Sequence, residues 1–268
     1  MFVLANGFMS HQQHRSLKHE YELYVEREIE DYKDSIPRSA ILSIGDEAVA
    51  KLRAQEQVAF DELVLWAEVD RIITSRLRIP NYAAWKRRRL KRLAEYRRPE
   101  HWGMLPDAPL VRAISACTEA HVLVTGPRVS ESTLYLAANG CTVTAVGDAP
   151  DVVERVMIAA EAVGLARQVN AFMSPLSEWA PDGPLTAVVC SPAAFVGLSD
   201  LDRARVIELL QSATLDGGVH LVETIVAGQT ALTIEELRAQ YHGWSISVER
   251  EDSASPTFFA RKAVGESS

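Results

Sequence analysis

The sequence predicts an α/β fold in which a mostly parallel sheet with an antiparallel last strand follows an all-helical module. In residues 118–262, short β-branched runs alternate with helical segments, as in parallel strands joined by crossover helices. In residues 17–98, apolar side chains recur only at helical spacing. The charge also shifts: residues 1–103 hold 18 Lys and Arg against 16 Asp and Glu, net +2, whereas residues 104–268 hold 10 against 20, net −10. We therefore expect two domains with these bounds.

From the composition we expect a folded protein that is neither exported nor inserted in a membrane. Apolar residues make up 47% and charged residues 24% of the 268, too apolar a balance for a disordered chain. The chain has no run of eighteen apolar residues, and its first ten residues lack a basic leader. Three cysteines without metal-ligand spacing fit a reduced, cytoplasmic protein without a structural metal.

The first region is expected to consist of helices. An acidic helix covers residues 17–32 and ends at Pro37, and a short helix is expected after Asp46, which is an acceptable N-cap. A longer helix over 58–77, stopped by Pro80, carries a broad apolar face and should form the core of the module. We expect this module to cap the active site or to mediate homo-oligomerisation.

The most basic stretch of the chain is residues 81–98, where eight Lys and Arg alternate with aromatic and leucine side chains. Such a helix could bind phosphates through one rigid basic face. It could also be a solvated face that pairs with the acidic helix over residues 20–34. We favour the second interpretation and do not expect nucleic acid as a partner. A net charge of +2 over the first 103 residues is small for a region that binds nucleic acid.

In the second region, β-branched runs predict strands and amphipathic segments predict the helices between them. The expected strands are 121–126, 142–147, 169–173, 185–191, 219–226, 244–251 and 257–262. The expected helices are 130–140, 150–165, 201–215 and 234–241. The last two strands are joined by Ser-Ala-Ser-Pro, which favours an antiparallel hairpin at the edge of the sheet.

Several of these segments together resemble one enzyme family. HVLVTGPRVSESTLYLAANGCTVTAVGDAPDVVERV, LTAVVCS, LDGGVHLVET and the late FFARK are similar, in order and spacing, to the landmarks of class I S-adenosylmethionine-dependent methyltransferases, in particular small-molecule and tellurite-resistance types. The resemblance covers about residues 118–262. It implies a Rossmann-like sheet, S-adenosylmethionine as the cofactor and a small-molecule substrate.

The cofactor loop after the first strand departs from the family pattern. Gly126 corresponds to the first glycine of the Gly-x-Gly-x-Gly turn, whereas Arg128 and Ser130 stand where the next two glycines belong. Val124 stands where the family has an acid that holds the amino group of the cofactor. Arg128 would therefore either pair with the cofactor carboxylate or fill the space that the cofactor needs.

The resemblance implies further cofactor-binding residues at the ends of the next strands. The family has an acidic residue that binds the ribose where this chain has Gly147, and Asp148 follows one position later. Ser174 lies where the family contacts adenine, and Cys190 and Ser191 lie at the end of the fourth strand beside the expected site.

No catalytic residue is predicted, because methyl transfer depends mainly on proximity and alignment. We expect Cys190 to be a small core residue, and His220 and Glu223 to be strand residues with satisfied polar groups. Two functions remain open. One is S-adenosylmethionine-dependent methyl transfer to a small molecule. The other is an inactive pseudo-methyltransferase that serves as a binding or regulatory partner, because three of the four signature residues of the loop are missing.

Overall fold

The computed structural model describes residues 16–54, 61–114, 120–126, 129–223, 232–249 and 256–264. The chain forms two compact units, Met1–Arg92 and Leu93–Ser268. The division therefore falls within helix α4 (Tyr82–Tyr96), before the segment at which the composition changes.

The first unit is helical, as the apolar spacing predicts, with α1 (Leu17–Ser35), α2 (Arg38–Ala54), α3 (Glu62–Arg76) and the first part of α4. The expectation that a short helix begins after Asp46 is wrong, because α2 runs through this residue. Gly45 lies inside the helix despite the low helix propensity of glycine, because the buried side chains that hold α2 in place recur at one-turn intervals. They are Ile44, Ala48 and Leu52.

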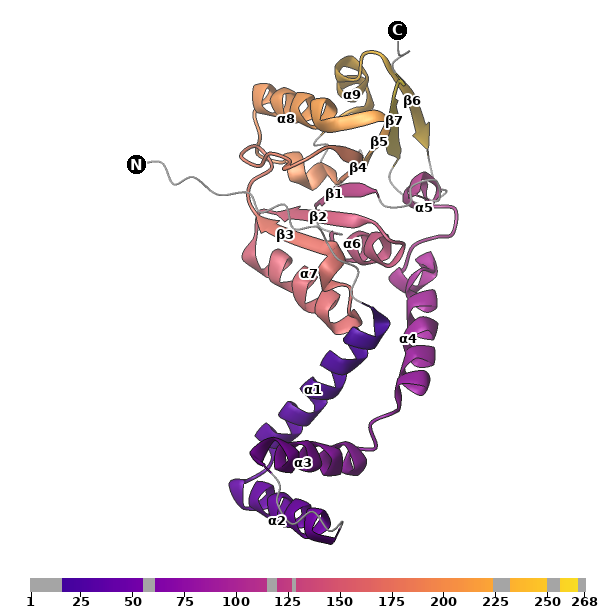
Figure 1. Ribbon diagram of the computed structural model, residues 1–268. Helices are drawn as coiled ribbons and strands as arrows, with labels where there is room; N and C mark the ends of the chain where they lie inside the picture. The colour runs from indigo at the N-terminus through magenta and orange to yellow at the C-terminus, as the bar shows by residue number, and fades with distance from the viewer. Residues whose placement is uncertain are drawn as a thin grey trace, which may run out of the picture. The chain divides into compact units, whose positions relative to one another are not determined.

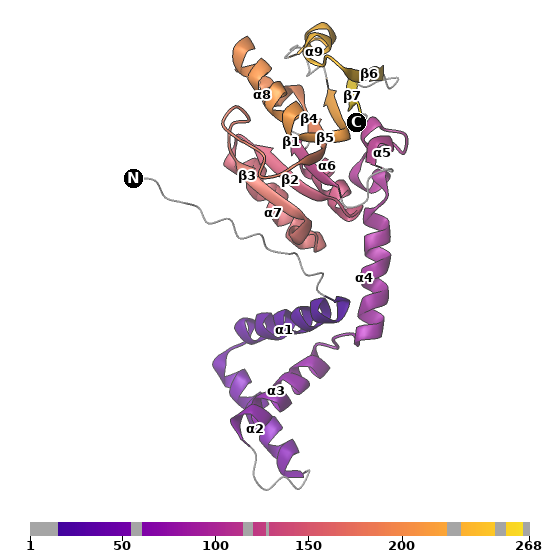
Figure 2. The same cartoon turned by 45° about the horizontal axis from the view of Figure 1, so that its top comes forward.

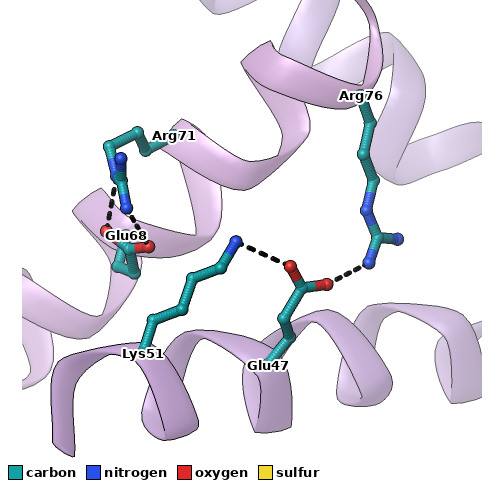
Figure 3. A network of polar contacts seen from close by, with 5 residues as sticks. All are labelled: Glu47, Lys51, Glu68, Arg71 and Arg76. Carbon is teal, nitrogen blue, oxygen red and sulfur yellow. Dashed lines mark hydrogen bonds and ion pairs between the residues drawn. The ribbon is translucent and has the colours of Figure 1, made fainter. Parts of the chain in front are cut away.

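Helix α3 begins later than the sequence predicts because Asp61 caps it, accepting a hydrogen bond from the Val64 amide at 2.9 Å. The expected first residues, 58–60, lie outside the described residues. An ion pair between Glu47 and Arg76 reinforces the contact between α2 and α3 (Figure 3). Glu47 of α2 accepts from Lys51 one turn later and from Arg76 of α3.

Helices α1 and α4 meet through aromatic rings at the start of α4. The Tyr21 and Trp85 ring centroids lie 5.5 Å apart, and Tyr24 stacks on Trp85 at 6.1 Å. The Tyr21 hydroxyl donates to the Pro80 carbonyl at 2.9 Å. The expected pairing of acidic and basic helices is seen within this unit for Glu20 and Arg89, which lie 3.6 Å apart.

The second unit contains a seven-stranded sheet in the order β3-β2-β1-β4-β5-β7-β6. The strands are β1 (His121–Thr125), β2 (Thr142–Gly147), β3 (Val169–Met173), β4 (Leu185–Cys190), β5 (Thr214–Glu223), β6 (Trp244–Glu249) and β7 (Thr257–Lys262). Neighbouring strands pair in parallel from β3 to β5, and β7 pairs antiparallel with both β5 and β6. The predicted fold class, a mostly parallel sheet with an antiparallel last strand, is confirmed.

Helices cover both faces of this sheet (Figures 1 and 2). Side chains alternate between two cores, so that Val122 and Val124 face one core while Leu123 faces the other. The first core is covered by α5 (Pro109–Ile114), α6 (Val129–Ala138) and α7 (Pro150–Val163), and the second by α8 (Asp200–Ala213) and α9 (Ile234–Gln240). Short 3-10 helices are η1 (Pro99–Trp102), η2 (Ala166–Gln168) and η3 (Pro192–Phe195).

Strand β5 begins five residues before the expected start at Val219, at Thr214. The pairing with β4 shifts register here, from Leu185 opposite Thr214 to Ala187 opposite Val219. The expected Gly-Gly turn is thus an irregularity inside the strand. A Cβ atom at Gly218 would lie 2.9 Å from the Thr186 carbonyl oxygen, so only glycine fits. The expected end of this strand, 224–226, lies outside the described residues.

Candidate functional site

The predicted cofactor-binding residues gather at the carboxyl ends of four adjacent strands. Gly126 follows β1, Asp148 follows β2, and Ser174 follows β3. Cys190 is the last residue of β4, and Ser191 comes directly after it. Open α/β sheets bind ligands at this edge. Arg128, the sixth predicted residue, lies outside the described residues.

Gly126 is required by packing against the end of β4. Its φ is +119°, and a Cβ atom there would lie 2.2 Å from Cβ of Ser191. The Ser191 amide donates to the Thr125 carbonyl at 2.9 Å and extends the pairing of β1 with β4. The contact with Ser191 thus accounts for the glycine without a ligand, although the sequence suggested an approach of the cofactor.

The ends of β2 and β3 offer polar groups to a ligand. The Ser174 amide donates to the Gly147 carbonyl at 3.0 Å, which holds the residue after β3 beside the end of β2. Asp148 is exposed, and within the described segments its carboxylate makes no hydrogen bond or ion pair. The Ser174 hydroxyl donates to the Pro175 carbonyl at 3.1 Å and keeps lone pairs with which to accept. A free carboxylate and a hydroxyl therefore lie at neighbouring strand ends.

Cys190 is a core residue, as predicted. Its side chain is 2% exposed and packs in the core beneath α8 and α9. Burial raises the pKa of the Cys190 thiol to about 12. The thiol is therefore protonated at neutral pH and does not act as a nucleophile.

His220 is fully buried and both of its ring nitrogens are satisfied, as predicted. The Thr214 hydroxyl donates to the Leu210 carbonyl at 2.7 Å, so its oxygen must accept from Nε2 of His220 at 2.7 Å. Nδ1 then accepts from the Tyr241 hydroxyl at 2.7 Å. These partners fix the neutral tautomer that carries its proton on Nε2. Burial, and secondarily the Lys262 charge, lowers the pKa of His220 to about 3.

Sequence reasoning missed the partners Thr214 and Tyr241. The signal available was weak: a histidine in an apolar strand needs two partners, but nothing in the sequence singles out a tyrosine 21 positions away. The arrangement is structural, because His220 lies in mid-strand and the ring of Trp244 packs 4.8 Å from it. Glu223, at the end of β5, is half-buried.

A shallow pocket lies away from this edge, between the end of α4, η1 and the end of α6. The Arg97 Nε donates to the Ala138 carbonyl at 3.2 Å, and the Asn139 side-chain amide donates to the Arg97 carbonyl at 3.5 Å, so Arg97 is held at the end of α6. Asn139 comes shortly before β2, so the pocket lies at the amino ends of the strands. The carboxyl edge is the better candidate because ligands of such sheets bind there.

Among the described residues, no group of three or more His, Cys, Asp or Glu side chains lies close enough together to bind a metal ion. None of the described helices is both long enough and apolar enough to span a membrane.

Comparison with known proteins gives matches only among solved structures. No family model and no curated protein matches the chain. The solved structures include TehB from Haemophilus influenzae (17% identity, 57% of this chain and 61% of that chain, TM-score 0.47) and the N-methyltransferase NodS from Bradyrhizobium japonicum WM9 (12% identity, 59% and 99%, TM-score 0.47). NodS in complex with S-adenosyl-L-homocysteine matches at 14% identity (58% and 87%, TM-score 0.46).

The matched region of this chain thus spans less than two thirds of TehB. The strand order and the antiparallel β7 agree with the sheet that the sequence resemblance implies. The second unit therefore has the Rossmann-like, mostly parallel sheet that the resemblance to class I S-adenosylmethionine-dependent methyltransferases implies.

Proposed function

We propose that the second unit binds S-adenosylmethionine at the carboxyl edge of β3, β2 and β1 and transfers its methyl group to a small molecule. The observation that carries this proposal is the exposed Asp148 carboxylate, which follows β2 and has no partner within the described segments. A carboxylate in this place suits the two hydroxyls of a ribose, since each can donate one hydrogen bond to it.

The residues present fit the nucleoside half of the cofactor better than its amino-acid half. Asp148 would hold the ribose, and Ser174 at the end of β3 would lie beside the adenine. At the end of β1, by contrast, Ser191 already fills the space beside Gly126. The amino-acid half would therefore depend on the loop that contains Arg128, whose guanidinium suits a carboxylate.

Bound S-adenosylmethionine would supply an electrophilic methyl group. The protein would contribute mainly position: the strand ends fix the cofactor-binding groups on a rigid sheet, and alignment of an acceptor atom accounts for most of the rate. Neither buried titratable group discussed above serves as a base or nucleophile. The Cys190 thiol stays protonated, and His220 is enclosed by partners in mid-strand.

A specific observation favours the alternative, a pseudo-methyltransferase that acts as a binding or regulatory partner. The contact of Gly126 with Ser191 explains the one surviving glycine of the loop without a ligand. On this alternative Arg128 fills the cofactor space, and an Arg128→Gly variant should bind no more weakly than the parent. If Arg128 instead holds the cofactor, the same variant should lose about 1.5 to 3 kcal/mol of binding free energy.

Calorimetric titration with S-adenosyl-L-homocysteine tests the proposal without knowledge of the methyl acceptor. The parent should bind, and Asp148→Ala should bind at least about tenfold more weakly, because the variant loses hydrogen bonds to a charged acceptor. Asp182→Ala is the matched control, since Asp182 is also exposed but precedes β4 at the amino ends of the strands. Equal affinity in Asp148→Ala and the parent would remove Asp148 from the site.

A further inference from the structure

We propose that the helical unit pairs two copies of this chain, with a basic face on α4 of one copy against an acidic face on α1 of the other. The basic face is defined as Lys86, Arg87 and Lys91, and the acidic face as Glu22, Glu26, Glu30 and Asp34. This inference is independent of cofactor binding.

The basic face carries charge that its own unit leaves uncompensated. All three of its residues are exposed, and none has an ion-pair partner in the part of the chain that the structure describes. Arg89 of the same helix behaves differently: its side chain is 12% exposed and lies 3.6 Å from Glu20. Arg88 and Arg92 lie roughly 60° and 20° around α4 from Trp85, and their charges act on the Tyr24 side chain of α1. The helix thus turns these two arginines and Arg89 towards α1 and presents the basic face to solvent.

The acidic face is equally available. All four of its residues are exposed, and two of them, Glu26 and Asp34, have no ion-pair partner among the described residues. Glu30 contacts Lys33 at 2.8 Å, and Glu22 lies 3.6 Å from His19.

The two faces of one copy do not face each other. Helices α1 and α4 pack through Tyr21 and Trp85. With 100° between successive residues, Arg87 and Lys91 lie roughly 120° to 160° around α4 from Trp85, and Glu26 lies roughly 140° around α1 from Tyr21. The charged faces therefore point away from the α1–α4 contact, and each needs a partner from outside the copy.

Each face also carries an exposed leucine. Leu90 is 46% exposed and lies one turn after Lys86 and Arg87, and Leu23 is 36% exposed and lies one turn before Glu26. Exposed ion pairs alone contribute little to stability. A leucine surrounded by charges gives each face an apolar contact that the charges orient, as in interfaces with a dry centre and a polar rim.

A second copy fits these features better than a nucleic acid does. A polyanion on α4 would leave the acidic face of α1 uncovered, whereas a second copy offers a basic face to that acidic face. In a two-fold pair each complementary contact forms twice, so both faces of both copies are covered.

Charge reversal tests the pairing on the full-length chain by sedimentation equilibrium. The parent should dimerise, and raising the salt from about 50 mM to about 500 mM should weaken the dimer. Arg87→Glu with Lys91→Glu should weaken dimerisation at least about tenfold, and so should Glu22→Lys with Glu26→Lys, because like charges then face each other. An equimolar mixture of the two variants should form a mixed dimer.

The control is Arg205→Glu with Arg238→Glu, the same change of charge at exposed positions of α8 and α9, which should leave the dimer unchanged. Circular dichroism checks that each variant keeps its helices. A parent that remains monomeric at about 100 μM would overturn the proposal. So would a dimer that neither reversal weakens, or a failure of the mixture to pair. A monomer that binds duplex DNA through the basic face would show a nucleic-acid surface instead.

Discussion

Replacing His220 by glutamine should remove a large part of the acid sensitivity of the second unit. Burial lowers the pKa of His220 from 6.5 to about 3. Between these values the unfolded chain binds a proton at this residue and the folded chain does not. The contribution of His220 to stability is therefore complete above pH 6.5 and falls as the pH falls towards 3.

The size of the effect follows from the shift. A pH of 5 lies 1.5 units below the ordinary histidine pKa of 6.5, so His220 is protonated in the unfolded chain and must lose this proton on folding. The free energy of unfolding should therefore be about 2 kcal/mol smaller at pH 5 than at pH 7.5. In His220→Gln the amide can still accept from the Tyr241 hydroxyl and donate to the Thr214 hydroxyl, but it cannot titrate.

Urea unfolding at pH 7.5 and pH 5, followed by circular dichroism, measures the difference. The parent should lose about 2 kcal/mol more than His220→Gln between the two pH values, because acid effects at all other groups are common to both proteins. Equal losses in the two proteins would refute the reasoning, since His220 would then not resist protonation.

Two further predictions concern the packing of the second unit. Gly140 has a φ of +92°, and a Cβ atom there would meet no other atom within 4 Å, so Gly140→Ala should destabilise the protein by about 1 kcal/mol. Gly126→Ala should destabilise it by at least about 3 kcal/mol, because the added Cβ also collides with Ser191. Similar losses of stability for the two variants in urea unfolding would contradict this prediction. In a Cys117→Ser variant, the buried Cys141 and Cys190 should not react with a thiol reagent at pH 8 until the protein unfolds, and labelling of the native protein would show the burial to be wrong.

The strands and helices of the second unit could be predicted because each depends on its own segment. A run such as residues 121–125 is β-branched and apolar, and its buried pattern is local in the sequence. The same local reasoning placed Asp148 and Ser174 at one edge, because the carboxyl ends of parallel strands must meet there.

What could not be predicted depends on contacts between distant residues. Gly126 is fixed by Ser191, which directly follows another strand, so the sequence alone suggested a ligand instead. The start of β5 depends on the backbone of Thr186 against Gly218, and no property of the Gly-Gly pair shows whether it turns the chain or bulges a strand. Helix α2 passes Asp46 because burial of one face outweighs the capping preference of a single residue.

The most direct test of the central claim pairs a change in the ligand with a change in Asp148. Calorimetry would compare S-adenosyl-L-homocysteine with its 2′-deoxy and 3′-deoxy ribose analogues, on the parent and on Asp148→Ala. If the carboxylate holds the ribose, loss of one hydroxyl should weaken binding to the parent by about tenfold and should change binding to the variant little. An equal loss in both proteins, or no binding of S-adenosyl-L-homocysteine to the parent, would contradict the assignment of the cofactor site.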